Sequence, residues 1–368
     1  MARSPSPLIV SVVLVAAAAL GPAFAAVEAA PPASQWRTVK GGPGPRYALQ
    51  AVWDAPRERL LVHAGETNRY ADGKFAGFVM HADTWSFDPA TDTWTRLNIQ
   101  GANPSARAFY AACFDGSRNG IWLHGGFDGE KMLDDLWFFD CAKDAWSKVD
   151  QQGELPPIRD FHSMIYNAKR DQLMIFAGLR DLARMDMLDD HWTFDTKRKT
   201  WTKLPAAKVG PAARFGQTTA WDEKGQRMFV QGGLGAQGKP TSAELWVYAV
   251  DDGAWVSRKD KRAMNFTAGQ MVYLADRDQL LIFGGGGSNW EYWGDLKAAV
   301  WTPAATAAPV DRRGYHAMAL DPTGGRLFVI GGVPRNFLDE CVPGDLAIAT
   351  LPAATETAPE TSPAVNAP

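Results

Sequence analysis

Five arginines occupy one position of a repeated pattern, and the guanidinium group is well suited to holding carboxylates and sulfates. Each is followed after eight residues by Asp or Asn, and after eleven more by Gly; they are Arg46, Arg107, Arg159, Arg214 and Arg313. Gathered around one opening, five guanidinium groups would bind a carboxylate, a sulfate or an acidic loop of a partner protein. The alternative is that each arginine hydrogen-bonds to backbone or to a neighbouring repeat and serves the scaffold.

Aromatic side chains in two variable segments form a second candidate site. Segment 66–82 carries Tyr70, and segment 286–294 carries Trp290 and Trp293. Rings of this kind suit a sugar ring or a partner side chain, whereas the alternative is that they pack down as a lid. Because loops vary while the scaffold repeats, we expect these three aromatics to bind ligand together with the five arginines.

Acid–base, metal and thiol chemistry are less well supported by the sequence. Glu66, Asp128 and Glu291 are candidate acid–base groups, but nothing in their spacing singles them out, so we assign no catalytic residue. His63 and His124 occupy related positions in adjacent repeats and could lie near each other. A metal site needs three or four converging ligands, which we cannot assemble, so we predict neither metal nor cofactor. Three cysteines are an odd number and argue against a disulfide framework.

The elements that would position these residues are short strands. Residues 159–204 contain four strand-like runs, HSMIY, QLMIF, HWTFD and TWTKL, separated by turn-forming segments. Such a meander cannot cover both of its own faces, so it needs neighbours of the same kind. The arginine pattern marks five copies and Phe266 begins a sixth, with a period of roughly 47–61 residues. This periodicity predicts an all-β propeller or solenoid array.

The two ends of the repeat region complement each other. Residues 35–39 (QWRTV) read as a closing Trp strand with no repeat in front of it, and the sixth repeat lacks its fourth strand. We predict that the N-terminal strand completes the last blade and closes the ring, because a closed ring has no free sheet edge through which to aggregate.

The remaining segments predict an exported protein. Residues 1–25 read as a secretory signal peptide, with an apolar run over 8–20 and small residues that fit cleavage after Ala25. Residues 26–34 are a Pro/Ala lead-in, 35–351 the propeller, and 352–368 a Pro/Ala/Thr-rich tail that we expect to be disordered. We expect a periplasmic or extracellular monomer without a membrane span. A net charge of −3 and a pI of about 6.1 give no indication of a nucleic-acid partner.

The repeat resembles the kelch repeat over residues 35–351. Its fullest forms are Arg159-Asp-Phe-His162-Ser163 and Arg313-Gly-Tyr-His316-Ala317, followed by a strand ending in a Gly pair, by Asp-Leu-Trp and by a late Trp. The resemblance implies a six-bladed β-propeller of four-stranded blades around a central channel. It also implies that the arginines lie near one mouth of the channel, on the face where the loops after each Gly pair emerge.

Kelch-type enzymes offer alternatives. Galactose oxidase shares the propeller, but its copper site needs a Tyr–Cys crosslink and a further C-terminal domain, so the resemblance does not extend to that chemistry. Plant specifier proteins use a Glu-x3-Asp-x3-His iron motif, which Glu291 and Asp295 match but Ala299 breaks. Periplasmic sialic-acid mutarotases are closer in size and compartment. Such a reaction needs an acid, a base and an arginine for the sugar carboxylate.

The sequence therefore favours a binding module over an enzyme. We expect an exported kelch-repeat protein that binds an anionic or carbohydrate ligand, or a protein loop, at an arginine-lined channel mouth. The alternative is a carbohydrate-active enzyme of the sialic-acid mutarotase type.

Overall fold

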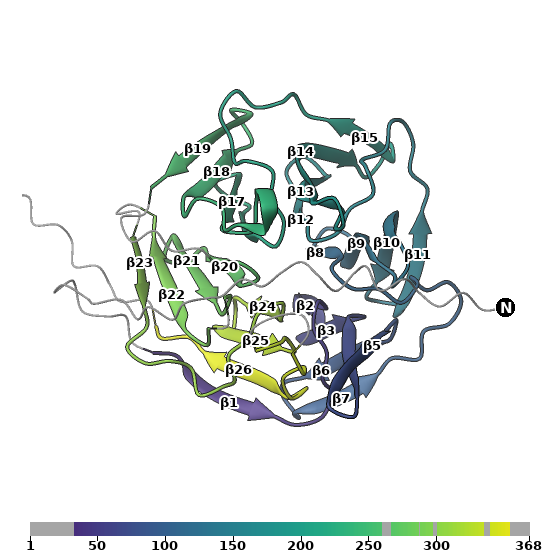
Figure 1. Cartoon of the computed structure of the whole chain (residues 1–368), viewed down its shortest axis with the longest axis vertical. Helices are drawn as coiled ribbons and strands as arrows, with labels where there is room; N and C mark the ends of the chain where they lie inside the picture. Colours follow the sequence, from purple (N-terminus) through teal and green to yellow (C-terminus); the bar gives the residue numbers. More distant parts are fainter. Residues whose placement is uncertain (1–32, 260–265, 287, 297–299, 335–338, 354–368) are drawn as a thin grey trace, which may run out of the picture.

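Six four-stranded antiparallel sheets are arranged around a central axis, as the blades of a β-propeller (Figure 1). The structure, a computed structural model, describes residues 33–259, 266–286, 288–296, 300–334 and 339–353. The architecture confirms the predicted all-β, six-bladed fold. The proposed signal peptide (1–25), most of the lead-in and residues 354–368 of the proposed tail lie outside the described residues.

Each blade runs outwards from an inner first strand, and the first strands of neighbouring blades contact one another around the axis. Blade 1 contains β2 (Gln50–Asp54), β3 (Arg59–His63), β6 (Thr84–Asp88) and β7 (Thr93–Arg96); blade 2 contains β8 (Ala111–Asp115), β9 (Gly120–Phe127), β10 (Met132–Asp140) and β11 (Ala145–Val149). Blade 3 contains β12 (Ser163–Asn167), β13 (Gln172–Asp181), β14 (Asp186–Asp195) and β15 (Thr200–Lys203); blade 4 contains β16 (Thr218–Asp222), β17 (Arg227–Gln231), β18 (Leu245–Ala249) and β19 (Ala254–Arg258). Blade 5 contains β20 (Gln270–Leu274), β21 (Gln279–Phe283), β22 (Glu291–Asp295) and β23 (Val300–Pro303); blade 6 contains β24 (Ala317–Asp321), β25 (Arg326–Ile330), β26 (Leu346–Thr350) and β1 (Gln35–Val39). Two 3-10 turns, η2 (Ala55–Arg57) and η3 (Ala236–Gly238), lie in connections.

Blade 3 shows how the sequence sets these strands. All four predicted runs form strands. β13 continues past Gly178 to Asp181, and β14 begins at Asp186, before its predicted run; the register of the pair shifts between Phe176 and Gly178. Leu179 pairs with Met187 there, so the two strands project as a hairpin. Blade 2 has a similar extension, and blade 1 carries a separate hairpin of β4 (Glu66–Ala71) and β5 (Lys74–Met80). We call the face with these connections between second and third strands the loop face, and the opposite face the turn face.

The core lies between blades, and the closing Trp of one blade packs on the blade before it. The ring of Trp146 lies 4.9 Å from that of His63, Trp201 lies 5.3 Å from His124, and Trp255 lies 4.9 Å from Phe176. The rings of His63 and His124 thus pack against Trp rings of the following blade. The two histidines have different hydrogen-bond partners: His124 Nδ1 bonds His162 Nε2 at 3.0 Å, and His63 Nδ1 bonds Thr84 Oγ1 at 2.9 Å.

The N-terminal strand closes the ring, as predicted. β1 pairs with β26 in an antiparallel register from Gln35↔Thr350 to Val39↔Leu346. The ring of Trp36 lies 5.1 Å from that of Phe283 in blade 5. Glu291, also in blade 5 and 1% exposed, accepts hydrogen bonds of 2.7 Å from Ser34 Oγ and Trp36 Nε1. A buried carboxylate therefore binds the segment that closes the propeller.

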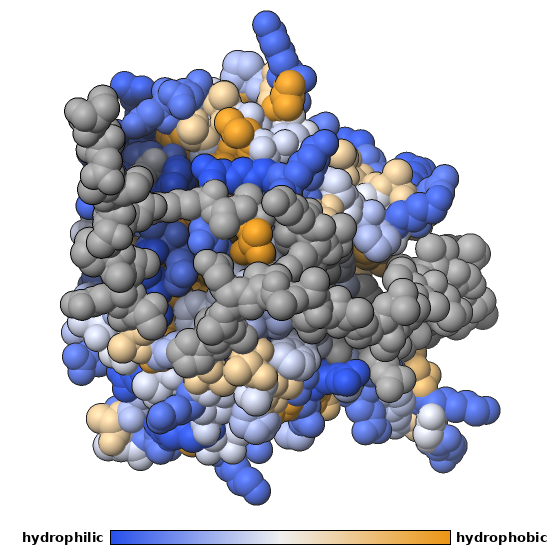
Figure 2. Space-filling view, turned by 90° about the vertical axis from the view of Figure 1, so that its left-hand side faces the viewer, coloured by the Kyte–Doolittle hydropathy of each residue, from blue (hydrophilic) through white to orange (hydrophobic). Residues whose placement is uncertain are grey.

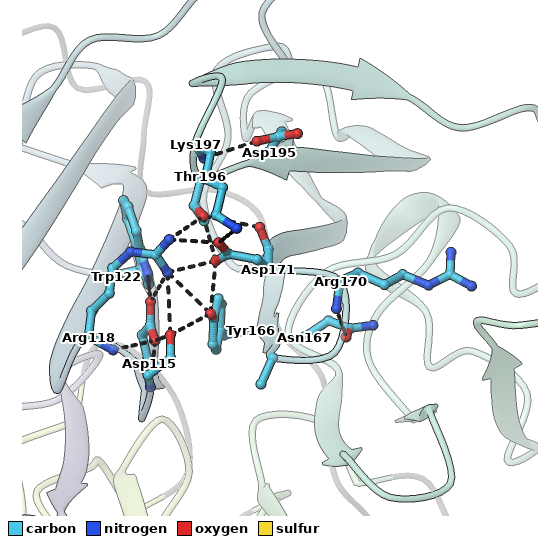
Figure 3. Close-up of polar contacts among 12 residues, drawn as sticks. Asp115, Arg118, Trp122, Tyr166, Asn167, Arg170, Asp171, Asp195, Thr196 and Lys197 are labelled. Carbon is cyan, nitrogen blue, oxygen red and sulfur yellow. Dashed lines mark hydrogen bonds and ion pairs between the residues drawn. The ribbon is translucent and has the colours of Figure 1, made fainter.

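Charged side chains link neighbouring blades on the turn face. Arg118 of blade 2 makes a two-pronged ion pair with Asp171 of blade 3, at 2.6 and 2.8 Å, and also binds Asp115 of its own blade at 2.8 Å (Figure 3). Tyr166 and Thr196 donate further hydrogen bonds to Asp171. These bonds, led by those from Arg118, hold the pKa of Asp171 below its usual value. The network therefore stabilises the interface between blades 2 and 3.

The rim of the ring carries both hydrophilic and hydrophobic residues. On the side shown in Figure 2, hydrophilic residues predominate and hydrophobic ones appear in small, separate groups. Among the described residues, no helix has the length and apolar character needed to cross a membrane. All three cysteines are free thiols.

Candidate functional site

The five repeat arginines lie on the loop face, each four residues before an inner strand, and their side chains are 0–3% exposed. In every case Nη1 donates to the backbone carbonyl 18 residues further on, at 2.9–3.2 Å; the acceptors are Ala64, Gly125, Ala177, Gly232 and Gly331. The arginine carbonyl in turn accepts an N–H from a glycine of the preceding blade, for example Gly126 to Arg159 at 3.0 Å. The repeated spacing is thus explained by two structural hydrogen bonds per blade.

Three of the arginines are also neutralised within the protein. Arg46, Arg107 and Arg159 bind Asp83, Asp135 and Asp190 of their own blades at 2.7, 2.6 and 2.8 Å. Burial by itself would raise the pKa of Asp83, but hydrogen bonds from Arg46 and Trp85 lower it to about 2. These guanidinium groups could reach an outside anion only by giving up a buried ion pair, which costs several kcal/mol, roughly 3–5.

Among the described residues, Arg214 and Arg313 make no such ion pair, although the charges of Glu244, and of Asp311 and Asp345, act on them from further away. Arg214 donates to the carbonyls of Ala212 and Gly232 and to Thr241 Oγ1, and Arg313 to those of Asp311 and Gly331. In the part of the chain that the structure describes, neither makes an ion pair, and burial lowers the pKa of both to about 10. The geometry favours the scaffold role for the arginines as a set, and contact with ligand stays a prediction.

A ring of left-handed residues surrounds the channel mouth on the loop face. Two residues after each repeat position, φ is between +52° and +65°, at Ala48, Phe109, Phe161, Gly216, Ala268 and Tyr315. Their backbone groups bond from blade to blade at 2.8–3.0 Å, including Phe109 N–H to Ala48 O and Phe161 N–H to Phe109 O. These bonds satisfy backbone groups that an open channel would leave to water.

Three aromatic side chains from this ring meet across the mouth. Phe109 and Phe161 stack with ring centres 4.1 Å apart, and Tyr315 lies 6.4 and 5.8 Å from them. Blades 3 and 6 are opposite each other, so the contact between Phe161 and Tyr315 spans the axis. We call these three residues the aromatic plug. The plug was not predicted from the sequence, although blades 2, 3 and 6 each carry an aromatic residue two positions after the arginine.

Methionines from the hairpins extend this apolar surface. Met80 packs against the same buried cluster as Phe109 and Tyr315. Met132, Met185 and Met187 pack against the same buried cluster as Phe161. All four are half-buried, as are the plug residues. Exposed side chains beside them include Phe78 at 39% and Leu182 at 44%. We call the four methionines the methionine collar. The loop face therefore presents an apolar centre where the sequence predicted a ring of cations.

Of the three aromatic residues predicted to bind ligand, two are half-buried near the loop face and one lies in the core. Tyr70 lies on β4, half-buried, with its ring edge toward Phe75 at 6.2 Å. Trp290 is half-buried just before β22. Trp293 is 5% exposed and belongs to the core between blades 5 and 6, with Arg277 over its ring at 5.8 Å. It offers no open surface to a ligand, because it lies on the strand that the sequence analysis assigned to a loop.

The candidate acid–base groups lie apart. Glu291 binds the N-terminal strand, and Asp128 accepts the backbone N–H groups of Glu130 and Lys131 in a hairpin turn. Glu66 is 4% exposed and burial raises its pKa to about 7, partly offset by a hydrogen bond from Tyr47. Among the described residues, no three His, Cys, Asp or Glu side chains gather as a metal site.

Comparison with known proteins agrees with this architecture. A family model, the KLHDC2/KLHL20/DRC7 Kelch-repeats domain, matches residues 31–233 and 168–349, which together include every blade. The chain belongs to the kelch-repeat family. This kelch protein is also 29% identical over 183 residues to human Leucine-zipper-like transcriptional regulator 1, covering 47% of the chain and 20% of that protein.

Two further relatives show the same partial overlap. Mei4-dependent protein 6 of Schizosaccharomyces pombe is 28% identical over 210 residues, 52% of the chain and 30% of its own length. The dynein alpha chain of the flagellar outer arm of Chlamydomonas reinhardtii is 28% identical over 180 residues, 45% of the chain and 4% of its own length. The chain thus spans less than a third of each relative, and the likeness concerns the kelch repeats.

Proposed function

We propose that this kelch propeller is an exported protein-interaction module whose partner polypeptide binds the loop face at the aromatic plug and methionine collar. The observation that carries the proposal is the half-buried aromatic cluster at the centre of that face, which shares its two underlying apolar clusters with half-buried methionines. Aromatic residues supply most of the binding energy in protein interfaces, and flexible methionines adapt to a partner's shape. Kelch membership agrees with an interaction role.

Site-specific photo-crosslinking in the native host tests this proposal. A benzoylphenylalanine placed at Phe161 or Leu182, on the loop face, should form a discrete adduct with a partner protein. The same probe at Lys197, 78% exposed on the turn face, is the matched control and should give none. Adducts at Lys197 alone, or equally at all three positions, would count against a loop-face partner.

A second candidate ligand, a carboxylate, is favoured by Arg214 and Arg313. In blades 1 to 3 an Asp binds the guanidinium group, whereas these two arginines hydrogen-bond only neutral oxygens within the described residues. Glu244, and Asp311 with Asp345, act on them only at longer range. Thermal melting with hexaglutamate, sugar acids or sulfated glycans is the test. A ligand at a hundredfold excess over its Kd stabilises by about 2.7 kcal/mol. An equal shift in the Arg214→Gln, Arg313→Gln double variant would show that the arginines are not the site.

Export is part of the proposal and has its own test. Residues 1–25 carry the apolar run and the small residues of a cleavage site. Amino-terminal sequencing of the protein recovered from the periplasm or the medium should begin at Ala26. Recovery of the uncleaved chain with the cytoplasmic fraction would refute export.

A further inference from the structure

The hairpin of β4 and β5 lies outside the four-stranded sheet of blade 1 (Figure 1). Its two-residue turn is Asp72-Gly73, both with positive φ, as in the type I′ turns that join antiparallel strands. Within the described residues the two strands pair only with each other, apart from one bridge between Tyr47 and Glu66. A hairpin of this kind has edges that the propeller does not cover.

The hydrogen-bond pattern identifies the open edge as β5. Glu66 exchanges both backbone hydrogen bonds with Tyr47, at 2.9 and 3.0 Å, so its N–H and C=O point away from β5. Because these directions alternate along an antiparallel pair, the backbone N–H and C=O of Thr67 point toward Val79, and the backbone N–H and C=O of Phe78 point outward, away from β4. In the described part of the chain, Phe78 makes no backbone hydrogen bond outside the hairpin.

The same edge has a register shift between Arg69 and Tyr70 but lacks most of the other features that usually protect one. Charged side chains, prolines and covering loops normally prevent an edge strand from pairing with another chain. β5 reads KFAGFVM, with a single charge at its first residue. Phe78 and Val79 point to opposite faces of the strand and are 39% and 40% exposed. Both faces of the edge therefore carry a partly exposed apolar side chain, and the ring of Phe78 also lies 6.5 Å from that of Phe127 in blade 2.

A groove of about 660 Å³ begins where β5 ends. One wall is the segment from Met80 to Thr84, which continues the chain of β5, and the other is the segment from Arg96 to Asn103. Leu97 and Ile99 supply apolar surface. Asn98 and Asn103 are exposed amides; Asn98 Oδ1 accepts from Gln100, and Asn103 Nδ2 donates to the carbonyl of Ala82 on the other wall at 3.0 Å. Primary amides donate to and accept from peptide groups. The groove thus extends the edge in the direction of the chain.

We infer that β5 and this groove together bind an extended segment of the partner polypeptide by strand addition, an inference that rests on the proposed interaction function. The outward N–H and C=O of Phe78 hydrogen-bond the incoming backbone, as in other strand-addition complexes. The open edge selects an extended chain, and the exposed Phe78 and Val79 select apolar side chains on both of its faces. The segment continues between Leu97 and Ile99 on one side and Met80 on the other.

Selection of random dodecapeptides displayed on phage, against the full chain, provides the probe. Enriched peptides should be rich in apolar residues, and binding should slow hydrogen exchange of the Phe78 amide. Phe78→Pro removes the outward N–H and leaves the β4–β5 ladder intact, and Phe78→Ala is the matched control that keeps the N–H. Loss of that bond should weaken binding about tenfold relative to Phe78→Ala.

Each other outcome separates this inference from the proposed function. Equal affinity of the two Phe78 variants, or unchanged exchange of the Phe78 amide, would overturn strand addition. If binding survives Phe78→Pro but is lost on Phe161→Ser, the plug is the interface and only the strand-addition inference fails. If no peptide is enriched and no photo-adduct forms at the loop face, both fail.

Discussion

Replacing Trp36 by Phe should weaken ring closure through the loss of one hydrogen bond. Trp36 Nε1 donates to Glu291 at 2.7 Å, and the carboxylate also accepts from Ser34. Within the described residues Glu291 makes no ion pair, so these neutral donors are what offset its burial. A hydrogen bond to a charged group contributes about 1.5–3 kcal/mol. We expect Trp36→Phe to lower the free energy of unfolding by about 2 kcal/mol.

Blade 1 offers a matched control at the same blade position. Trp94 packs on Phe87 of its own blade with ring centres 5.0 Å apart, whereas Trp36 packs on Phe283 of the preceding blade. Among the described residues, the buried Nε1 of Trp94 has no hydrogen-bond partner. Trp94→Phe therefore removes similar ring area without removing a hydrogen bond, and it should cost less than Trp36→Phe. Guanidinium denaturation followed by circular dichroism measures both. Equal losses in the two variants would refute the claim that the Glu291 contact closes the ring.

The difference between the two variants should also depend on pH. Burial raises the pKa of Glu291 above its usual value, while the hydrogen bonds from Ser34 and Trp36 oppose that rise. A carboxyl group with a raised folded pKa contributes stability at low pH that is lost as pH rises through that pKa. Removing the Trp36 donor raises the folded pKa further, so the deficit of Trp36→Phe should grow from pH 5 to pH 8. A deficit that shrinks over this range would contradict the reasoning.

Three other outcomes follow from the contacts between and within blades. Asp171→Asn should lower the free energy of unfolding by about 1–2 kcal/mol at neutral pH, because it breaks the ion pair with Arg118. The difference from wild type should shrink in acid, because the pKa of Asp171 lies below its usual value. Arg159→Met should cost about 3–5 kcal/mol in chemical denaturation because it leaves the carboxylate of Asp190 buried and unpaired, whereas Arg214→Met, without such a partner, should cost less. Amide hydrogen exchange should be faster in blade 5, which has Phe266 in place of the repeat arginine, than in blade 3; equal protection would mean that the arginine does not set blade stability.

The number of blades and their closure could be predicted because both depend on spacing that is visible in one chain. The role of the arginines could not, because their partners lie far away in sequence. Asp83 is 37 residues from Arg46, and Asp135 is 28 from Arg107, so no fixed interval connects them. Only the return of the third strand alongside the second brings each pair together. Three of the five predicted cations are thereby held in internal ion pairs.

The aromatic plug was hidden for a different reason. The residues two positions after the repeat arginine differ in type, and only the left-handed backbone ring shows that they converge on the axis. That backbone does not require a large side chain, because Ala48, Gly216 and Ala268 adopt the same φ and take part in the same chain of hydrogen bonds. Left-handed geometry is in fact disfavoured for bulky residues, by roughly 1–2 kcal/mol each. Phe109, Phe161 and Tyr315 therefore add nothing to the backbone ring that Ala or Gly would not provide. Their rings pack on one another and on the buried clusters beneath them, and with the methionine collar they form the apolar surface at which we propose that a partner binds.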